Sequence, residues 1–322
     1  MSDNPFYKLA PFIQEYIYRN KWESLHEVQV RAINAILDTP DHILISSGTA
    51  SGKTEAALLP IITDIYENPP ATIGVMYIGP LKALINDQFE RITGLLEESG
   101  IPVQSWHGDV SQSKKERFLR RSQGIVQITP ESLEAMLINR HHELARLFSE
   151  LRYVVIDEIH AFIDSDRGRQ VMCQLERLAR FQQIPARRIG LSATLGEPQI
   201  AMNWLQGNTN TAVNLIQVSK GSKIEIGLEY FLLPDDEDED TIDEESEDIV
   251  ESQDNSLSEL LEDITVYYEH LHRMTQRVPK TLIFANRRTD TEEIIVNLRQ
   301  LSDRNHLPSF YHVHHGSVSS AL

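Results

Sequence analysis

Apolar residues gather in short strand-like segments that alternate with helical segments between residues 42 and 205. The strand-like segments are residues 42–47, 72–79, 103–106, 125–129, 152–157 and 188–194. Between them, segments such as residues 81–96 and 167–180 repeat their apolar positions with a helical period. Strands that are apolar along their whole length are typical of a parallel sheet covered by helices on both faces. The pattern therefore predicts an α/β fold.

The pattern changes after residue 205. The later predicted elements are strands at 212–218 and 224–233, a helix at 256–273, a strand at 280–286, a helix from Thr289 and a strand at 310–315. From residue 280 onward they restart the strand–helix–strand order of an α/β domain. We therefore predict a first domain at 1–210, an inter-domain segment at 211–234, an acidic disordered loop at 235–255 and the start of a second domain at 256–322.

Acidic residues are concentrated in one stretch. Residues 235–254 contain thirteen Asp or Glu and no Lys or Arg, so the rest of the chain carries −5 of the formal net charge of −18. Such a run buries no apolar surface, which favours a solvated, disordered loop. The sharper alternative is a mimic of nucleic-acid charge that competes for a binding cleft. Net charge therefore does not decide whether the partner is nucleic acid.

Length and composition exclude several classes of protein. A chain of 322 residues with 41% hydrophobic residues has room for two domains with their own cores. No stretch approaches the roughly 20 apolar residues that span a bilayer, and the first residues lack an apolar signal core, which points to the cytoplasm. The single cysteine, Cys173, builds neither a disulfide framework nor a thiolate zinc site, and we expect it in the core.

The segment "SGTASGKTEAALLP" at residues 47–60 matches a phosphate-binding loop between a strand and a helix. Ser47 stands where Gly or Ala is usual. Small side chains then leave the backbone amides free to converge on phosphate oxygens, at Gly48, Thr49, Ala50, Ser51 and Gly52. The alternative is an ordinary strand-to-helix turn rich in Gly and Ser.

The two residues after these small ones carry the chemistry of the loop. Lys53 would place a positive charge between the β- and γ-phosphates, and the Thr54 hydroxyl would ligate Mg²⁺. Pro60 falls about two turns into the helix that follows. We expect it to kink or end that helix.

Two further segments place polar side chains where predicted strands end. In "VVIDEIHAF", Asp157 is placed to hold Mg²⁺ through water, and Glu158 to orient and deprotonate the water that attacks the γ-phosphate. A capped strand end is the alternative. In "GLSATLG", the hydroxyls of Ser192 and Thr194 lie at another strand end, although Ser-Ala-Thr is also an ordinary way for a strand to finish.

In this order the motifs resemble the superfamily 2 DExH-box helicases, most closely the large-helicase-related (Lhr-like) branch. The segments that carry the resemblance are "SGTASGKTEAALLP", "PLKALINDQ", "HGD", "TPESLEAML", "DEIH", "LSATLG", "LIFANRR" and "HHGSVS". The resemblance implies a RecA-like P-loop NTPase domain, in which helices sandwich a parallel sheet, and an incomplete second RecA-like domain. It also implies ATP and Mg²⁺ as cofactors and single-stranded nucleic acid as partner, with DNA favoured over RNA.

The resemblance assigns further residues of the nucleotide site. The segment "KWESLHEVQ" is similar to the helicase Q-motif, in which Gln29 would read the adenine edge and Trp22 would stack on it. Leu25 stands where many relatives have Pro, and Gln29 as a helix-surface residue is the alternative. By the same resemblance His160, Ser192 and Thr194 would couple the γ-phosphate to the nucleic-acid site, whereas a satisfied core histidine is the alternative for His160.

Members of the same family bind the phosphates of one nucleic-acid strand at the carboxyl ends of the strands of their sheets. The resemblance assigns this role to Lys82, Gly108, Thr129, Arg287 and Arg288. Thr129 and Pro130 are explained equally well as a helix N-cap followed by an N1 proline. The basic segment "SKKERFLRR" at 113–121 is more typical of a solvated helix face. The histidines at 312, 314 and 315 resemble the family's "HHG" turn rather than a metal site.

The expected activity is ATP-dependent translocation on nucleic acid and unwinding. In the family, arginines beyond "HHGS" reach the γ-phosphate, and such residues are worth about 10³ to 10⁵ in rate. Because the sequence given ends at Leu322, before those motifs, we expect this chain alone to hydrolyse ATP near background. The alternative function is a nucleotide-binding interaction module without turnover, acting with a partner subunit. A small-molecule phosphotransferase is disfavoured by "DEIH" and "SAT" together.

Overall fold

The computed structural model describes residues 4–48, 52–108, 110–120, 122–193, 195–218, 226–231, 266–278 and 280–313, apart from the side chains of a few residues in two helices. The chain divides into two compact units, Met1–Ser222 and Lys223–Leu322, and each is described here by itself. The acidic loop expected at 235–255 lies outside the described residues.

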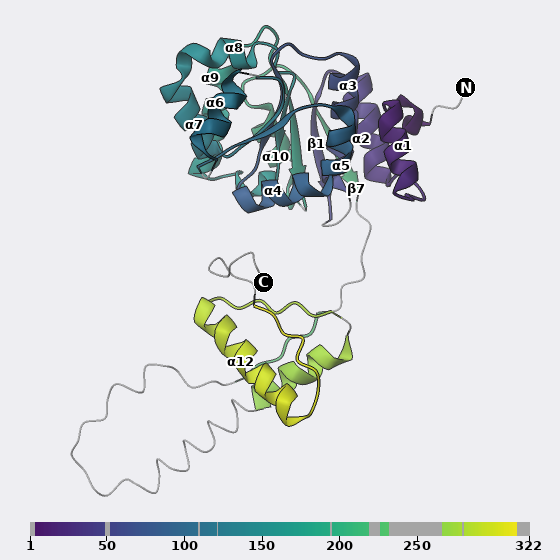
Figure 1. The fold of residues 1–322 in the computed structure, drawn as a ribbon, viewed down its shortest axis with the longest axis vertical. Helices are drawn as coiled ribbons and strands as arrows, with labels where there is room; N and C mark the ends of the chain where they lie inside the picture. Colours follow the sequence, from purple (N-terminus) through teal and green to yellow (C-terminus); the bar gives the residue numbers. More distant parts are fainter. Residues whose placement is uncertain are drawn as a thin grey trace, which may run out of the picture. The chain divides into compact units, whose positions relative to one another are not determined.

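One parallel sheet organises the first unit (Figure 1). Its strands, within the described residues, are β1 (His42–Ser47), β2 (Ile73–Ile78), β3 (Val103–Trp106), β4 (Gly124–Ile128), β5 (Tyr153–Ile156), β6 (Arg187–Ser192) and β7 (Val213–Val218). They lie in the order β3-β4-β2-β5-β6-β1-β7, and every adjacent pair is parallel. The predicted α/β fold with a parallel sheet is confirmed.

Helices cover both faces of this sheet. On one face lie α1 (Pro11–Arg19), α2 (Glu27–Asp38), α3 (Lys53–Glu67), α4 (Lys82–Arg91) and α5 (Thr93–Ser99). On the other lie α6 (Gln112–Arg120), α7 (Pro130–Asn139), α8 (Leu144–Phe148), α9 (Asp166–Ala179) and α10 (Pro198–Gln206). Figure 1 shows α1, α2 and α3 on one side of the sheet and α6 to α9 on the other.

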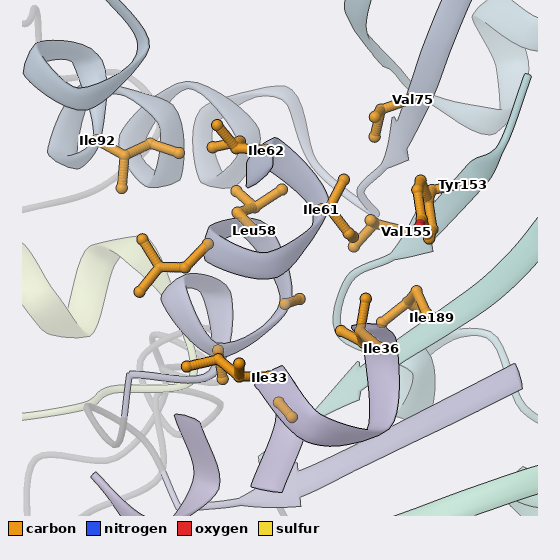
Figure 2. Close-up of a cluster of buried hydrophobic side chains, with 14 of the residues drawn as sticks. Ile33, Ile36, Leu58, Ile61, Ile62, Val75, Ile92, Tyr153, Val155 and Ile189 are labelled. Atoms are coloured by element: carbon orange, nitrogen blue, oxygen red, sulfur yellow. The ribbon is translucent and has the colours of Figure 1, made fainter. Parts of the chain in front are cut away.

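The two cores follow from the alternation of side chains along each strand. In β1, Ile43 and Ile45 join the core under α2 and α3, whereas Leu44 joins the core under α7 and α9. Figure 2 shows the first core, in which Ile36 and Ile61 of the two helices point toward residues of the sheet. Because both faces of the sheet are covered, the strands β1, β2 and β5 are buried along their whole length.

For the helices of the first unit, one expectation was wrong and another was wrong in part. Pro60 does not end its helix, because α3 continues to Glu67 with Leu59 and Ile61 fully buried, and this packing offsets one missing hydrogen bond. The helix expected at 81–96 is two helices. The Phe89 carbonyl accepts from both the Ile92 amide and the Thr93 hydroxyl, which tightens the last turn of α4 and ends it there.

Cys173 also differs from expectation. It lies on α9, where the buried residues are Val171, Gln174, Leu175 and Leu178, and its side chain is exposed. The helical period turns position 173 away from the core, which outweighs the general tendency of cysteine to be buried.

The region expected to link the domains divides between the two units. Residues 213–218, placed in the inter-domain segment by the sequence, form β7 and pair with β1 along its whole length. Of the strand expected at 224–233, the described residues 226–231 form none, and neither do 280–286 and 310–313. A strand needs a neighbour for its backbone hydrogen bonds, and the described residues of the second unit hold no paired strand; Leu228 and Phe284 are largely exposed there.

The second unit is built from helices in its described part. Residues 266–277 are helical, and α12 spans Arg288–Arg304, so the helices expected at 256–273 and from Thr289 form where they are described. Leu298 of α12 is buried, and the Tyr268 hydroxyl donates to Glu293 Oε1 at 2.6 Å, which joins the two helices.

The packing of α3 against the sheet predicts that shortening a buried side chain of this helix lowers the free energy of unfolding of the first unit substantially. We expect Ile61→Ala to lower the free energy of unfolding of the first unit by about 3 kcal/mol, because Ile61 is fully buried and a cavity remains. Denaturant titration followed by tryptophan fluorescence measures it, since all three tryptophans lie in the first unit. The control is Ile138→Ala, which removes the same atoms from a side chain 60% exposed. Equal losses in the two variants would contradict the packing described here.

Candidate functional site

The sequence-predicted residues of the first unit meet at one edge of the sheet. In parallel strands all carboxyl ends lie on the same side, which is where ligands bind in open α/β sheets. The neighbouring strands β5, β6 and β1 end next to Asp157, Ser192 and Ser47. The strands β3, β4 and β2 end next to Gly108, Thr129 and the start of α4. The edge therefore has two halves, with β2 and β5 adjacent at their boundary.

The loop between β1 and α3 is closed by a glycine that no other residue replaces without strain. Gly52 has φ 77° and ψ 32°, a left-handed conformation, and is the N-cap of α3. A Cβ atom on Gly52 would lie 2.6 Å from Gln29 Nε2. Gly48 is exposed at the start of the loop, whereas Thr49, Ala50 and Ser51 lie outside the described residues.

Lys53 folds back over this loop. Its Nζ donates to the carbonyl oxygens of Ser47 at 2.9 Å and Gly48 at 3.1 Å. Burial lowers the pKa of Lys53, and the negative charges of Glu158 and Asp157 oppose that shift. The ammonium group therefore donates to the loop backbone and is influenced by the charges of two carboxylates. A phosphate would offer it stronger, charge-assisted hydrogen bonds than these neutral carbonyl oxygens do.

Thr54 and Asp157 supply oxygen atoms next to this lysine in the sequence and in its electrostatic surroundings. The Thr54 hydroxyl donates to Gln88 Oε1 at 2.8 Å, and Asp157 accepts from the Tyr77 hydroxyl at 2.7 Å. Asp157 is 5% exposed, and burial raises its pKa although the Tyr77 hydrogen bond acts in the opposite direction. The same burial and the Asp157 charge raise the pKa of Tyr77 well above its usual value.

A hydroxyl and a carboxylate are ligands that suit Mg²⁺. Within the described residues no group of three or more His, Cys, Asp or Glu side chains is placed to hold a metal ion. Mg²⁺ keeps several waters and is usually held by one or two carboxylates together with substrate phosphates, so it does not need such a group. The donor set of Thr54 and Asp157 therefore fits a magnesium ion that arrives with a phosphate ligand.

Glu158 is held in an unusual conformation. Its φ of 49° and ψ of 50° are left-handed, which is uncommon for a residue with a side chain and typical of functional sites. Its Oε2 atom is buried and has no hydrogen-bond partner among the described residues. His160 Nδ1 lies 3.3 Å from that oxygen, but its hydrogen bond goes to Ser192 Oγ at 3.2 Å. A buried carboxylate oxygen left in this way is able to accept a proton from a bound water.

His160 and Ser192 connect two neighbouring strand ends. Ser192 is fully buried at the end of β6, whereas the His160 side chain is 48% exposed, so the alternative of a buried core histidine is wrong. Thr194 lies outside the described residues.

A pocket of about 390 Å³ opens beside Gly52. Its lining residues include Trp22, Glu23, His26 and Gln29. Gln29 is only 2% exposed, so it is not a helix-surface residue. Its Oε1 accepts from the His26 amide at 2.9 Å, as the third residue of α2 in a capping box. Gln29 thus has a structural role at the helix start and also forms a wall of the pocket.

The residues predicted for nucleic acid are less closely grouped. Lys82 is the first residue of α4, and Gly108 lies in an exposed turn after β3. Thr129 is the N-cap of α7 by backbone conformation, but its hydroxyl donates to Ser132 Oγ at 3.1 Å rather than capping the helix backbone. Pro130 is at N1, as the capping alternative required.

The predicted arginines belong to the second unit. Arg287 and Arg288 are exposed at the start of α12 and lie 3.4 Å and 2.9 Å from the carboxylates of Asp290 and Glu292 on the same helix. The basic segment expected at 113–121 forms most of α6. Of the three histidines near the end, only His312 lies within the described residues.

Sequence reasoning missed two residues of the site, Tyr77 and Gln88. Both lie near motifs that were recognised, since Tyr77 is the second-last residue of β2 and Gln88 closes the segment "PLKALINDQ". The signal for Tyr77 was a polar atom in an otherwise apolar buried strand, because a buried hydroxyl needs a hydrogen-bond partner.

A comparison with known protein families identifies the family to which the chain with this site belongs. The DEAD/DEAH box helicase profile matches residues 26–202, which include Gln29 of the pocket, the phosphate loop and all the described strand ends of the first unit except that of β7. The chain belongs to the DEAD/DEAH box helicase family. The family predicted from the motifs is therefore confirmed.

Individual helicases of this family are similar over almost the whole chain. The ATP-dependent helicase Lhr-Core of Methanothermobacter thermautotrophicus is 29% identical over 98% of this chain and 36% of its own length. Lhr-Core of Methanocaldococcus jannaschii is 31% identical over 99% of this chain and 36% of its own length. A solved structure of Mycobacterium smegmatis helicase Lhr, bound to single-stranded DNA and AMP-PNP, superposes with a TM-score of 0.70 at 25% identity, covering 98% of this chain and 39% of that one.

This helicase chain thus spans about a third of the length of the curated relatives it matches. Among its described residues, no helix is both long and apolar enough to cross a membrane.

The hydrogen bond between Tyr77 and Asp157 predicts a pH-dependent stability. We expect Tyr77→Phe to lower the free energy of unfolding at pH 7 by about 2 kcal/mol, because a buried carboxylate loses a donor. Loss of that bond raises the pKa of Asp157 further, so the folded variant takes up a proton at higher pH than wild type. Its deficit therefore shrinks as the pH falls through that raised pKa. Urea titrations at pH 7 and at about pH 5 measure both effects.

Tyr153→Phe is the matched control for this substitution. The Tyr153 hydroxyl donates to Asp64 Oδ2 at 3.1 Å, and the Asp64 side chain is 25% exposed, so water replaces the lost donor. We expect a cost below about 1 kcal/mol. A deficit for Tyr77→Phe that grows at low pH would contradict the assignment.

Proposed function

We propose that this chain is the ATP-binding part of an ATP-dependent helicase that acts on single-stranded nucleic acid, with DNA favoured. One observation carries the proposal: Lys53, which follows β1, interacts electrostatically with Asp157 and Glu158, which follow β5, and a buried oxygen of Glu158 has no hydrogen-bond partner among the described residues. The similarity to Lhr, whose structure holds AMP-PNP and single-stranded DNA, supports it. The two units would be two RecA-like domains.

The adenine of ATP would occupy the pocket beside Gly52. Gln29 lines that pocket with an amide that has both a donor and an acceptor, which suits the edge of adenine, and Trp22 offers a ring face for stacking. The phosphates would then lie over the start of α3, where backbone amides from Gly48 to Gly52 and the helix dipole favour negative charge.

Mg²⁺ would be held by Thr54 directly and by Asp157 through water. When bound, the ion neutralises charge on the β- and γ-phosphates. Lys53 would leave the loop carbonyls to bind these phosphates. The unpaired Glu158 oxygen would orient the attacking water and accept its proton.

Coupling to nucleic acid would use the hydrogen bond between His160 and Ser192, with Thr194 in the same motif. This bond links the strand that bears the catalytic carboxylates to the next strand of the sheet. A change at the γ-phosphate that moves Glu158 would therefore reach Ser192 through His160.

Nucleic-acid phosphates would contact the other half of the edge, at Lys82, Gly108 and Thr129. Arg287 and Arg288 would contribute from the second unit. We place this function in the cytoplasm, where ATP and nucleic acid are both available.

The nucleotide site predicts a specific loss of binding. The 322-residue chain should bind Mg·ADP, and Lys53→Ala should weaken binding by at least tenfold, because a charge-assisted contact to phosphate is worth about 1.5 to 3 kcal/mol. Glu158→Gln should leave the affinity within about twofold, since its role is at the attacking water. Isothermal titration calorimetry measures all three proteins.

Lys280→Ala, which removes an exposed lysine of the second unit, is the charge-matched control. Wild-type affinity in Lys53→Ala would exclude the phosphate loop as the binding site. If the wild type binds nucleotide but shows no ATP hydrolysis even when nucleic acid is present, a binding module without hydrolysis is the better description.

The nucleic-acid half predicts weak, salt-sensitive and nearly sequence-independent binding of single strands, because phosphates dominate such contacts. Lys82→Glu should weaken binding to all sequences alike and reduce the slope of log affinity against log salt by about 0.7. Fluorescence anisotropy with labelled single strands at several salt concentrations measures it. The control is Lys8→Glu, since Lys8 pairs with Asp38 at 2.6 Å just before β1 begins, at the opposite edge of the sheet. Equal effects of the two reversals would contradict a localised site.

A further inference from the structure

Helix α4 contacts Thr54 directly and Asp157 through Tyr77, and these are the two residues that the proposed function assigns to the metal. Gln88 Oε1 accepts from the Thr54 hydroxyl at 2.8 Å. The next residue, Phe89, packs edge-on against the Tyr77 ring, with centroids 4.9 Å apart and planes at 88°. Tyr77 in turn donates to Asp157. Two consecutive residues of one helix therefore fix the positions of the hydroxyl and the carboxylate.

The direction of the bond to Gln88 determines what Thr54 is able to bind. A hydroxyl has one proton to donate and two lone pairs to offer. When the Thr54 proton is donated to Gln88 Oε1, a lone pair of the same oxygen is left for a cation. Residues that hold a ligand atom by its remaining hydrogen bond typically contribute 10- to 100-fold to metal affinity.

We propose that Gln88 is a positioning residue that orients the Thr54 hydroxyl for Mg²⁺ and thereby ties α4 to the nucleotide site. The proposal rests on the proposed function, in which Thr54 ligates Mg²⁺. Gln88 does not touch the nucleotide itself. Its effect is confined to the metal-dependent part of nucleotide binding. A residue with only a packing role would instead affect nucleotide binding equally with and without Mg²⁺.

The link to α4 gives this contact a second consequence. The helix begins at Lys82, which the proposed function assigns to a nucleic-acid phosphate, and Gln88 is fewer than two turns further on. Thr54 is only 8% exposed and Phe89 only 5%, so packing in the core restricts the movement of both side chains. Metal binding at Thr54 and phosphate binding at Lys82 would therefore act on the same short helix, which Ile85 and Phe89 anchor in the core.

The test compares metal-dependent nucleotide binding in variants of the 322-residue chain. Binding of fluorescent mant-ADP is followed in EDTA and across a range of buffered free Mg²⁺. Gln88→Met keeps the length of the side chain and removes the oxygen acceptor. We expect the free Mg²⁺ concentration for half-maximal binding to rise about tenfold in this variant, and the affinity in EDTA to stay within about twofold of wild type.

Two further variants make the result specific. Gln88→Glu has the same shape and is able only to accept, so it should keep or lower the half-maximal Mg²⁺ concentration. Asn86→Met changes an exposed side chain on the same helix and should have no effect. If Gln88→Met does not fold by circular dichroism, Gln88→Ala is measured in the same way and carries the same expectation.

The outcomes separate this proposal from the proposed function. If wild type shows Mg²⁺-dependent binding that Lys53→Ala removes, yet the Gln88 variants titrate like wild type, the role of Gln88 is overturned and the nucleotide site stands. Equal losses in EDTA and in Mg²⁺ would also overturn it, because they indicate a packing defect. If wild type shows no Mg²⁺-dependent binding, the proposed function fails and this inference fails with it.

Discussion

The site depends on one constraint, that every strand of the sheet runs in the same direction. Parallel strands deliver all their carboxyl ends to one edge, so short segments far apart in the sequence meet there without any loop having to span the domain. The order β3-β4-β2-β5-β6-β1-β7 then sorts them. The motifs after β5, β6 and β1 surround the phosphate loop, and those after β3, β4 and β2 form the half proposed for nucleic acid.

The boundary between the halves lies where β2 pairs with β5, and it is joined by hydrogen bonds rather than by a loop. Tyr77 of β2 donates to Asp157 across this boundary, and Gln88 of α4 accepts from Thr54. A buried carboxylate with a raised pKa is costly to keep charged, and the Tyr77 hydroxyl offsets part of that cost. The same contact that stabilises Asp157 therefore brings α4 close to the metal-binding residues.

Much of the fold was predictable because its causes are local. Continuous apolar runs indicated six strands of the first unit, and the phosphate-loop and "DEIH" segments were correctly expected at strand ends. A strand was also expected at 212–218, but it was assigned to the inter-domain segment because the pattern changes after residue 205. It forms β7, the last strand in the order of the sheet, and is only partly buried. Strands expected in the second unit need partners that periodicity does not reveal. The contacts of Tyr77 and Gln88 join residues 80 and 34 positions apart, so no local pattern reports them.

The account's central claim is that Thr54 and Asp157, each held by a contact from the opposite half of the edge, form a magnesium and nucleotide site. A crystal structure of the chain with ADP and Mg²⁺ tests it most directly. The account predicts the diphosphate over the start of α3, Mg²⁺ at about 2.1 Å from Thr54 Oγ1, and Gln88 Oε1 still within hydrogen-bonding distance of that oxygen. Nucleotide bound away from α3, or Mg²⁺ bound without Thr54, would contradict it.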